Sequence, residues 1–387
     1  MAKPRAVNPF TYQHPVSAEE LIDREPELEQ LLSLVDGGHF VRLSGPRRYG
    51  KTTLLHRLTD EANKQLDMTA LIVDFYDVLS LADVAIRIEA AYRRSLEGPV
   101  RNFVRDLFLT WNVGLSLGAG GLSAKIEANP HTDPLPALHR LLDLPGEVFK
   151  KHGKRILIVF DEFQDVLDLK GVDGIIRSHI QHDSEAAAYV FAGSEPGLME
   201  KLFSDRERPL FGQAHPIQMR PLPDDALAFY IRERFVRTGR DVGDAIDPLI
   251  ELVRGHPQRA MLLAHYVWDL VPPGEAASIS TYSEALSAAL APLVDGFERF
   301  IRTLPTNEHR VLTALALSPR SLYSDYTLSR FGLPTASSAR SALDSLIDRG
   351  EVVSHDGNPE LVDPLLAFWL RHRRLPPNAS GGDAAAE

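Results

Sequence analysis

The chain has 387 residues, of which 44% are hydrophobic and 25% charged, a composition typical of a globular protein with two or three domains. It has no cysteine, which excludes disulfides, thiolate metal sites and cysteine nucleophiles and is compatible with the cytoplasm, the predicted location. The net charge of -11 argues against a surface that binds nucleic acid over its whole extent, and the sequence shows neither a signal peptide nor a membrane span, so no membrane association is predicted.

Residues 1–220 form the first predicted domain, because short apolar runs alternate there with stretches of helical periodicity. This alternation is typical of an α/β fold, in which helices cover both faces of a parallel sheet. The predicted strands are residues 40–44, 70–75, 156–160, 189–192 and 217–219. At about residues 112–129, apolar residues alternate on both sides of a glycine-rich turn, which predicts a β-hairpin inserted into the domain.

A glycine-rich turn follows the first predicted strand, with the sequence Gly45-Pro-Arg-Arg-Tyr-Gly50-Lys51-Thr52. It has the spacing of a P-loop, or Walker A motif, and it opens a helix, as that motif requires. Lys51 would reach the β- and γ-phosphates of ATP, and the Thr52 hydroxyl would ligate Mg²⁺. A chance match is the alternative, which the strand-loop-helix placement disfavours. The predicted nucleotide-binding residues of this motif are Gly45, Pro46, Arg47, Arg48, Tyr49, Gly50, Lys51, Thr52 and Thr53.

The predicted strand at residues 156–160 continues into two acids, Asp161 and Glu162. Magnesium bound to ATP needs a carboxylate at the carboxyl end of a nearby strand, so Asp161 is predicted to organise the magnesium water shell. Glu162 is predicted to be the general base toward a water in line with the γ-phosphate. A helix N-cap pair is the alternative interpretation. Acids at both positions favour ATP hydrolysis over a kinase, a GTPase or a catalytically silent scaffold.

The next predicted strand ends at Gly193 and is followed by Ser194. In P-loop ATPases the strand between the two Walker strands carries a polar residue that contacts the γ-phosphate or the attacking water. Ser194 is therefore the predicted catalytic sensor, together with Lys51 and Glu162 in the catalytic set. An ordinary glycine-serine turn at the end of a strand is the alternative.

The pattern changes after residue 220, where the predicted strands stop. Residues 221–302 repeat apolar residues at helical spacing, which predicts a small helical domain. Residues 303–375 indicate three helices, a hairpin and a last helix, the order of a winged helix-turn-helix. Residues 376–387 are small, polar and aperiodic, and they are predicted to be disordered.

Several further segments accompany the two Walker motifs in a fixed order. They are Asp23-Arg24-Glu25-Pro-Glu27-Leu28, Gly45-Pro-Arg-Arg-Tyr-Gly-Lys-Thr-Thr53, Phe160-Asp-Glu-Phe-Gln164, Gly193-Ser194, Pro209-Leu-Phe-Gly212, Gly255-His-Pro257 and Asp363-Pro-Leu-Leu-Ala-Phe-Trp-Leu370. This series resembles the archaeal-type ATPase family, a prokaryotic branch of the STAND and AAA+ ATPases related to origin-recognition initiators. The resemblance covers nearly the whole chain up to residue 374, and its most particular parts are the Gly-Pro-Arg-Arg form of the P-loop and the closing motif.

The resemblance implies an ASCE-type parallel sheet in the order 5-1-4-3-2, a helical lid and a C-terminal winged helix. Arg24 and Glu25 match the motif that closes over the adenine, and Pro257 matches the lid proline that lies near the nucleotide base. Arg259 would then be a sensor-2 arginine on the γ-phosphate, with a solvated arginine at a helix start as the alternative.

An arginine finger is not identified by the resemblance. Relatives usually carry arginine directly after the Pro-Leu-aromatic-Gly stretch, where this chain has Gln213. Arg206 and Arg208 are the substitutes offered by the sequence.

Two functions fit these motifs, both with ATP and Mg²⁺ as cofactors. The first is a slow ATPase that acts as a nucleotide-dependent switch, whose winged helix packs on the ATPase core or binds a protein partner, with a homo-oligomer also compatible. The second is an initiator-type protein in which ATP controls DNA binding by the winged helix. Residues 305–375 contain eight arginines, no lysine and eight acidic residues, and this neutral balance favours the switch over DNA binding.

Overall fold

The computed structural model describes residues 7–14, 21–111, 133–317, 321–355 and 357–373. The predicted hairpin at residues 112–129 and the predicted tail at residues 376–387 lie outside these ranges. The chain divides into two compact units. Unit 1 groups Met1–Asp23, Pro46–Gly50 and Arg220–Glu387, and unit 2 groups Arg24–Gly45 and Lys51–Met219.

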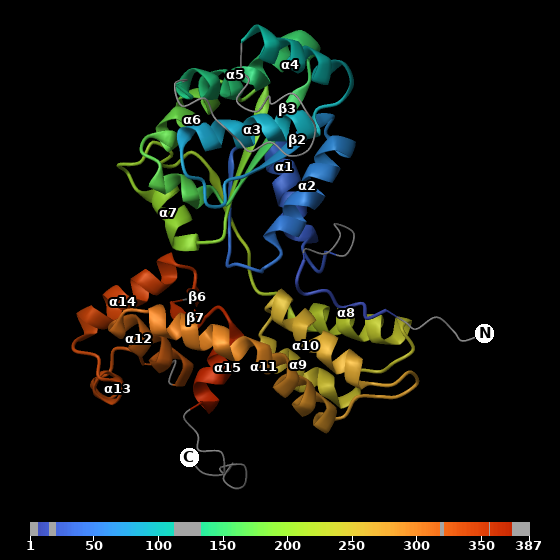
Figure 1. Cartoon of the computed structure of the whole chain (residues 1–387), viewed down its shortest axis with the longest axis vertical. Helices are drawn as coiled ribbons and strands as arrows, with labels where there is room; N and C mark the ends of the chain where they lie inside the picture. The colour runs from blue at the N-terminus through green and yellow to red at the C-terminus, as the bar shows by residue number, and fades with distance from the viewer. Residues whose placement is uncertain (1–6, 15–20, 112–132, 318–320, 356, 374–387) are drawn as a thin grey trace. The chain divides into compact units, whose positions relative to one another are not determined.

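Unit 2 is built on a five-stranded parallel sheet in the order β2-β3-β4-β1-β5 (Figure 1). This is the predicted order 5-1-4-3-2 counted from the other edge, so the predicted α/β class and sheet topology are confirmed. The strands are β1 Val41–Ser44, β2 Met68–Asp74, β3 Arg155–Asp161, β4 Ala187–Gly193 and β5 His215–Gln218. Strands β3 and β4 are almost entirely buried, as expected for central strands covered on both faces.

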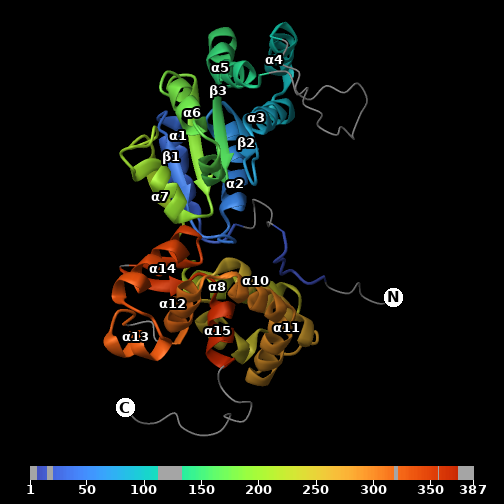
Figure 2. The ribbon, with the colours of Figure 1, turned by 60° about the vertical axis from the view of Figure 1, so that its left-hand side comes forward.

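Helices cover both faces of this sheet (Figures 1 and 2). Alternating residues of β2, β3 and β4, including Val73, Phe160 and Phe191, join one core with helices α3, α5, α6 and α7. Helices α1 and α2, which contact each other, lie on the opposite face, because the β1–α2–β2 crossover runs in the opposite direction across the sheet. The helices of unit 2 are α1 Glu25–Asp36, α2 Lys51–Gln65, α3 Leu81–Ser95, α4 Gly98–Thr110, α5 Leu135–His152, α6 Val172–Ile180 and α7 Pro196–Ser204, with a 3-10 helix at Phe163–Asp168.

The carboxyl ends of the parallel strands lie at one edge of the sheet. Pairing between β2 and β3 places Asp74 directly beside Asp161. Pairing between β1 and β4 places Ser44 beside Gly193. The P-loop, the two Walker acids and the predicted sensor therefore each come at or directly after the carboxyl end of a strand. This is the edge at which α/β sheets bind ligands.

Unit 1 contains a helical region followed by the predicted winged helix. The helices are α8 Asp224–Arg237, α9 Ile246–Val253, α10 Pro257–Leu270, α11 Ile279–Thr303, α12 Thr306–Leu317, α13 Asp325–Phe331, α14 Ala336–Asp348 and α15 Pro364–His372, with a 3-10 helix at Gly243–Ala245. An antiparallel pair, β6 Val352–His355 and β7 Asn358–Leu361, lies between α14 and α15. One hydrophobic core spans both parts, because α15 packs on α9 and α11 as well as on α12.

Side-chain caps fix the starts of several helices in unit 1. Ser278 and Thr281 form a reciprocal capping box at α11, and Ser324 and Thr335 cap α13 and α14. The Asp363 carboxylate accepts hydrogen bonds from the backbone N–H groups of the first turn of α15. Each such cap satisfies donors that the helix itself leaves unpaired, and typically contributes about 1 kcal/mol.

Candidate functional site

Two residues of the P-loop have left-handed backbone conformations. Gly50 has φ +87°, in the left-handed region that favours glycine, and Arg48 has φ +68°. A Cβ on Gly45 would lie 2.5 Å from the Cβ of Met219, so only glycine fits where the loop leaves the sheet. The loop therefore keeps a tight turn between β1 and α2, as phosphate binding by backbone N–H groups requires.

Helix α2 begins at Lys51, which places the predicted phosphate ligands at a helix N-terminus. The Lys51 side chain is only 6% exposed, and its Nζ donates to the Gly45 carbonyl oxygen at 2.6 Å. Thr52 is exposed, whereas Thr53 is buried. The positive end of the helix dipole and the buried ammonium together favour an anion at this position.

Asp161 is a buried carboxyl group in an acidic neighbourhood. Burial, the Glu162 charge and, to a smaller extent, Asp74 raise the pKa of Asp161 to about 6, against the lowering effects of the Glu162 backbone N–H and of Lys51. A divalent cation would relieve this concentration of negative charge, so the residues fit the predicted Mg²⁺. In the part of the chain that the structure describes, no group of three or more acidic or histidine side chains is arranged to hold a metal. The assignment of Thr52 and Asp161 as the residues that hold Mg²⁺ stays a prediction.

Glu162 is fixed by hydrogen bonds rather than serving as a helix cap. Ser194, which is 1% exposed, donates from its Oγ at 2.6 Å and from its backbone N at 3.2 Å to Glu162 Oε2. The backbone of Glu162 is left-handed, with φ +50°, and its side chain makes no capping hydrogen bond to the 3-10 helix that follows. The structure thus joins Glu162 to Ser194, two predicted site residues that lie 32 positions apart.

Two further polar residues of this edge were not predicted as site residues. Gln164 donates from Nε2 to Glu162 Oε2 at 2.7 Å, and Asp74 ends β2 beside Asp161. Each carries a sequence signal that could have been used. Gln164 is a polar residue between the apolar Phe163 and Val166, and Asp74 ends an apolar strand in the same way as Asp161.

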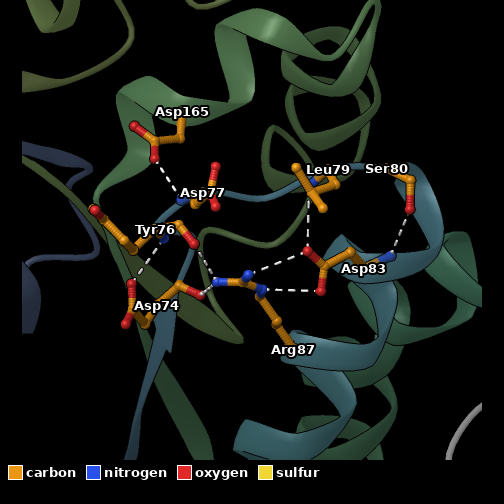
Figure 3. Close-up of polar contacts among 8 residues, drawn as sticks. All are labelled: Asp74, Tyr76, Asp77, Leu79, Ser80, Asp83, Arg87 and Asp165. Atoms are coloured by element: carbon orange, nitrogen blue, oxygen red, sulfur yellow. Dashed lines mark hydrogen bonds and ion pairs between the residues drawn. The ribbon is translucent and has the colours of Figure 1, made fainter. Parts of the chain in front are cut away.

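The loop after β2 is held in place by Arg87 of α3 (Figure 3). The Arg87 guanidinium donates to the backbone carbonyl oxygens of Asp74 at 2.9 Å and Tyr76 at 2.8 Å, and it forms a two-point ion pair with Asp83. The Asp77 backbone N donates to Asp165 Oδ2 at 2.7 Å (Figure 3). This loop is therefore tied both to α3 and to the 3-10 helix that follows Glu162.

The residues predicted to contact the adenine and the γ-phosphate have protein partners of their own. In unit 2, Arg24 is 3% exposed and pairs with Glu27 at 2.9 Å. In unit 1, Pro257 is the first residue of α10, and Arg259 is 2% exposed. The Arg259 guanidinium pairs with both oxygens of Asp363, with Nε 3.0 Å from Oδ1. Arg259 is thus buried in an ion pair rather than solvated, and its role toward the γ-phosphate stays a prediction.

His256 caps α10 beside this ion pair. Its Nδ1 accepts from the Arg259 backbone N at 3.3 Å, which requires that nitrogen to be unprotonated. Burial, with smaller contributions from the charges of Arg259 and Arg48, lowers the pKa of His256 to about 4 in spite of Asp363. Within the same unit, the Tyr49 ring lies 5.0 Å from the His256 ring. A neutral His256 is therefore part of the packing around Arg259.

Two arginines in the described part of the winged helix are paired with acidic side chains. Arg349 lies 3.5 Å from Glu308, and Arg373 stacks over Trp369 and lies 3.9 Å from Glu298. These pairs reduce the basic surface that the sequence offers to DNA phosphates.

Arg208, one substitute for an arginine finger, lies 3.5 Å from Asp173, whereas Arg206 is exposed. Gln213 donates to the Phe211 carbonyl oxygen at 3.3 Å. The assignment of an arginine finger to Arg206 or Arg208 stays a prediction.

Comparison with models of protein families assigns this chain to a known group. The model described as "ATPase domain predominantly from Archaea" matches residues 21–254, more than half of the chain. The chain belongs to this family. The resemblance to archaeal-type ATPases is therefore confirmed, and this family member also matches a model described as "probable winged helix domain" over residues 295–372, which confirms the predicted winged helix.

Two solved structures share the fold of this chain. A Walker-type ATPase of Pyrococcus abyssi is 19% identical, with a TM-score of 0.66 over 94% of this chain and 99% of that one. The ORC2 protein of Aeropyrum pernix, solved in ADPNP-ADP complexes, is 17% identical, with a TM-score of 0.56 over 94% of this chain and 95% of that one. No curated protein matches the chain. Across the described ranges, no helix is long and apolar enough to cross a membrane.

Replacing Asp161 with asparagine is expected to stabilise the nucleotide-free protein. The folded state keeps the Asp161 proton up to about pH 6, whereas the unfolded chain loses it near pH 3.8, so this carboxyl increasingly opposes folding as the pH rises through that window. The free energy of unfolding should increase by about 3 kcal/mol at pH 7.5 and by roughly half as much at pH 5. Urea unfolding in EDTA measures this gain, with the exposed Asp106→Asn as control. A gain that does not depend on pH would contradict it.

Proposed function

We propose that this chain binds ATP with Mg²⁺ and hydrolyses it slowly, and that the exchange between ATP and ADP acts as a molecular switch. The observation that carries the proposal is the Glu162 carboxylate, which Ser194 holds beside the buried Asp161. The charge of Lys51 acts on the same Asp161 carboxyl. A cation for the phosphates, an acid for the metal and a fixed base are the parts that phosphoryl transfer to water needs. Membership of the archaeal ATPase family and the nucleotide complexes of the ORC2 protein support a nucleotide as the ligand.

The proposed reaction is an in-line displacement by water. The water oxygen forms a bond to the γ-phosphorus while the bond from that phosphorus to the β–γ bridging oxygen breaks. The water proton passes to Glu162, and the products are ADP and inorganic phosphate. Lys51 would stabilise the charge on the β- and γ-phosphate oxygens, and Ser194 would keep the carboxylate in position. Mg²⁺, when bound by Thr52 and Asp161, would supply additional charge neutralisation at the phosphates.

Phosphate release by the full chain supplied with ATP and Mg²⁺ tests this function. Release is expected to be slow and to stop when EDTA removes the metal. ATP binding without any release would leave the catalytically silent scaffold, and no binding of ATP or ADP would contradict the proposal altogether.

The switch would act through Arg259 and its ion pair with Asp363. These residues lie 104 positions apart and join α10 to the N-cap of α15. A ligand shifts an equilibrium only by its different affinity for the two states, so a γ-phosphate that draws Arg259 away from Asp363 would distinguish ATP from ADP. Asp363 also caps α15, so a change at this carboxylate reaches the winged helix directly.

Hydrogen exchange in the first turn of α15 is expected to differ between the two nucleotide states. The backbone N–H groups of Leu365 and Leu366 donate to Asp363 Oδ1, and they should exchange faster when Arg259 leaves that carboxylate. The comparison is ATP-bound Glu162→Gln against ADP-bound wild type, followed by mass spectrometry. Arg259→Ala should abolish the difference, and the exposed Arg302→Ala should keep it. Equal exchange in both states would leave the switch without this mechanism.

A further inference from the structure

Gln164 is a polar side chain buried in the most apolar part of unit 2. It lies in the 3-10 helix Phe163–Asp168 and is 2% exposed. Its neighbours Phe163 and Val166 belong to the hydrophobic core of the sheet. Space for the amide exists because residue 193 is glycine, since a Cβ there would lie 2.5 Å from Gln164 Oε1.

The hydrogen bonds of Gln164 fix the orientation of its amide. Nε2 donates to Glu162 Oε2 at 2.7 Å and to Asp165 Oδ1 at 3.0 Å. Ionised carboxylates only accept hydrogen bonds, so the NH₂ group must face them and the oxygen must face away. That oxygen, Oε1, is buried and makes no hydrogen bond to any described residue. A buried acceptor without a partner costs stability, so the folded state gains little from this side chain as a core residue.

The donors on Glu162 converge on one of its two oxygens. Oε2 accepts from the Ser194 N and Oγ and from Gln164 Nε2, at 3.2, 2.6 and 2.7 Å. Within the described ranges no hydrogen bond reaches Oε1. Three donors from two directions leave the carboxylate little freedom to rotate, and they leave Oε1 as the oxygen able to accept a proton from water.

Gln164 is itself held from the far side. Its second acceptor, Asp165, also accepts from the Asp77 backbone N at the loop after β2 (Figure 3). That loop is tied to α3 through Arg87. The amide of Gln164 therefore bridges the fixed Asp165 carboxylate and the Glu162 carboxylate. This arrangement restrains the Glu162 side chain.

We propose that Gln164 is a positioning residue for ATP hydrolysis, which orients Glu162 so that Oε1 receives the water proton. The inference rests on the proposed function. Gln164 acts through Glu162 alone and makes no contact with nucleotide, so its loss should slow turnover without weakening ATP binding. Misplacement of a general base typically lowers turnover by about ten- to a hundred-fold.

The test compares Gln164→Met and Gln164→Leu with wild type. Both variants have an apolar side chain whose volume is near that of glutamine, and both remove the NH₂ donor and the unpaired oxygen. We expect kcat to fall about ten-fold or more in each, with less than a two-fold change in KM and in the Kd for ATP, and with no decrease in Tm. Gln181→Leu is the matched control, because Gln181 is exposed and precedes β4, at the amino edge of the sheet.

Adding Gln164→Met to Glu162→Gln separates positioning from a structural role. If Gln164 acts through Glu162, the double variant should turn over no more slowly than Glu162→Gln alone. A further fall in the double variant, weakened ATP binding, or unchanged or faster turnover in both single variants would overturn the inference while leaving the proposed function intact. Absence of hydrolysis by the wild type in the same assay would contradict the proposed function, and the inference with it.

Discussion

Glu162→Gln is expected to leave ATP binding nearly unchanged and to lower turnover by at least about 100-fold, the effect typical of losing a general base. Glutamine keeps an oxygen that accepts from Ser194 and Gln164, so the hydrogen bonds that hold this side chain survive. It cannot take the proton from water, because an amide is not basic at neutral pH. Binding is measured by equilibrium titration with ATP, and turnover by phosphate release.

Glu185→Gln provides the matched control, since Glu185 is an exposed glutamate that precedes β4 at the opposite edge of the sheet. It should have wild-type binding and turnover. Wild-type turnover in Glu162→Gln would show that Glu162 is only a structural residue, and the general-base assignment would then be lost.

Lys51→Ala is expected to abolish tight ATP binding. The Lys51 ammonium is buried at the N-terminus of α2 and would supply the principal side-chain charge on the β- and γ-phosphates. Loss of a hydrogen-bonded charge of this kind typically costs about 3 kcal/mol or more, which corresponds to an increase in Kd of at least about 100-fold. Isothermal titration with ATP and Mg²⁺ measures it.

Lys64→Ala is the control for this variant, because Lys64 is an exposed lysine in the last turn of the same helix. The control should bind ATP as the wild type does. An unchanged Kd in Lys51→Ala would remove the P-loop assignment.

The sheet and the P-loop could be predicted from sequence because their signals are local. A buried parallel strand is a short apolar run, and the Gly45–Thr52 spacing, with Lys51 opening α2, lies within eight consecutive positions. The predicted strand ends were less accurate, since β2 starts at Met68 instead of residue 70. The apolar run shows that a strand is present, whereas the ends of β2 depend on its pairing with β3.

The side-chain partners of the site could not be predicted in the same way. Ser194 reaches Glu162 across 32 positions, and Arg259 reaches Asp363 across 104 positions, so neither contact has a local pattern. The left-handed backbone of Glu162 is another example, because glutamate has no preference for that region. Such features follow from the packing of whole strands and helices, which a single sequence does not encode in any short motif.

The nucleotide that remains bound after one round of reaction tests the central claim most directly. The full chain, in excess over ATP with Mg²⁺, is incubated, quenched with acid and analysed for ATP and ADP. The wild type is expected to hold ADP, Glu162→Gln to hold unreacted ATP, and Lys51→Ala to hold neither. ATP that stays intact on the wild type, or ADP formed equally by the wild type and Glu162→Gln, would contradict hydrolysis by this site.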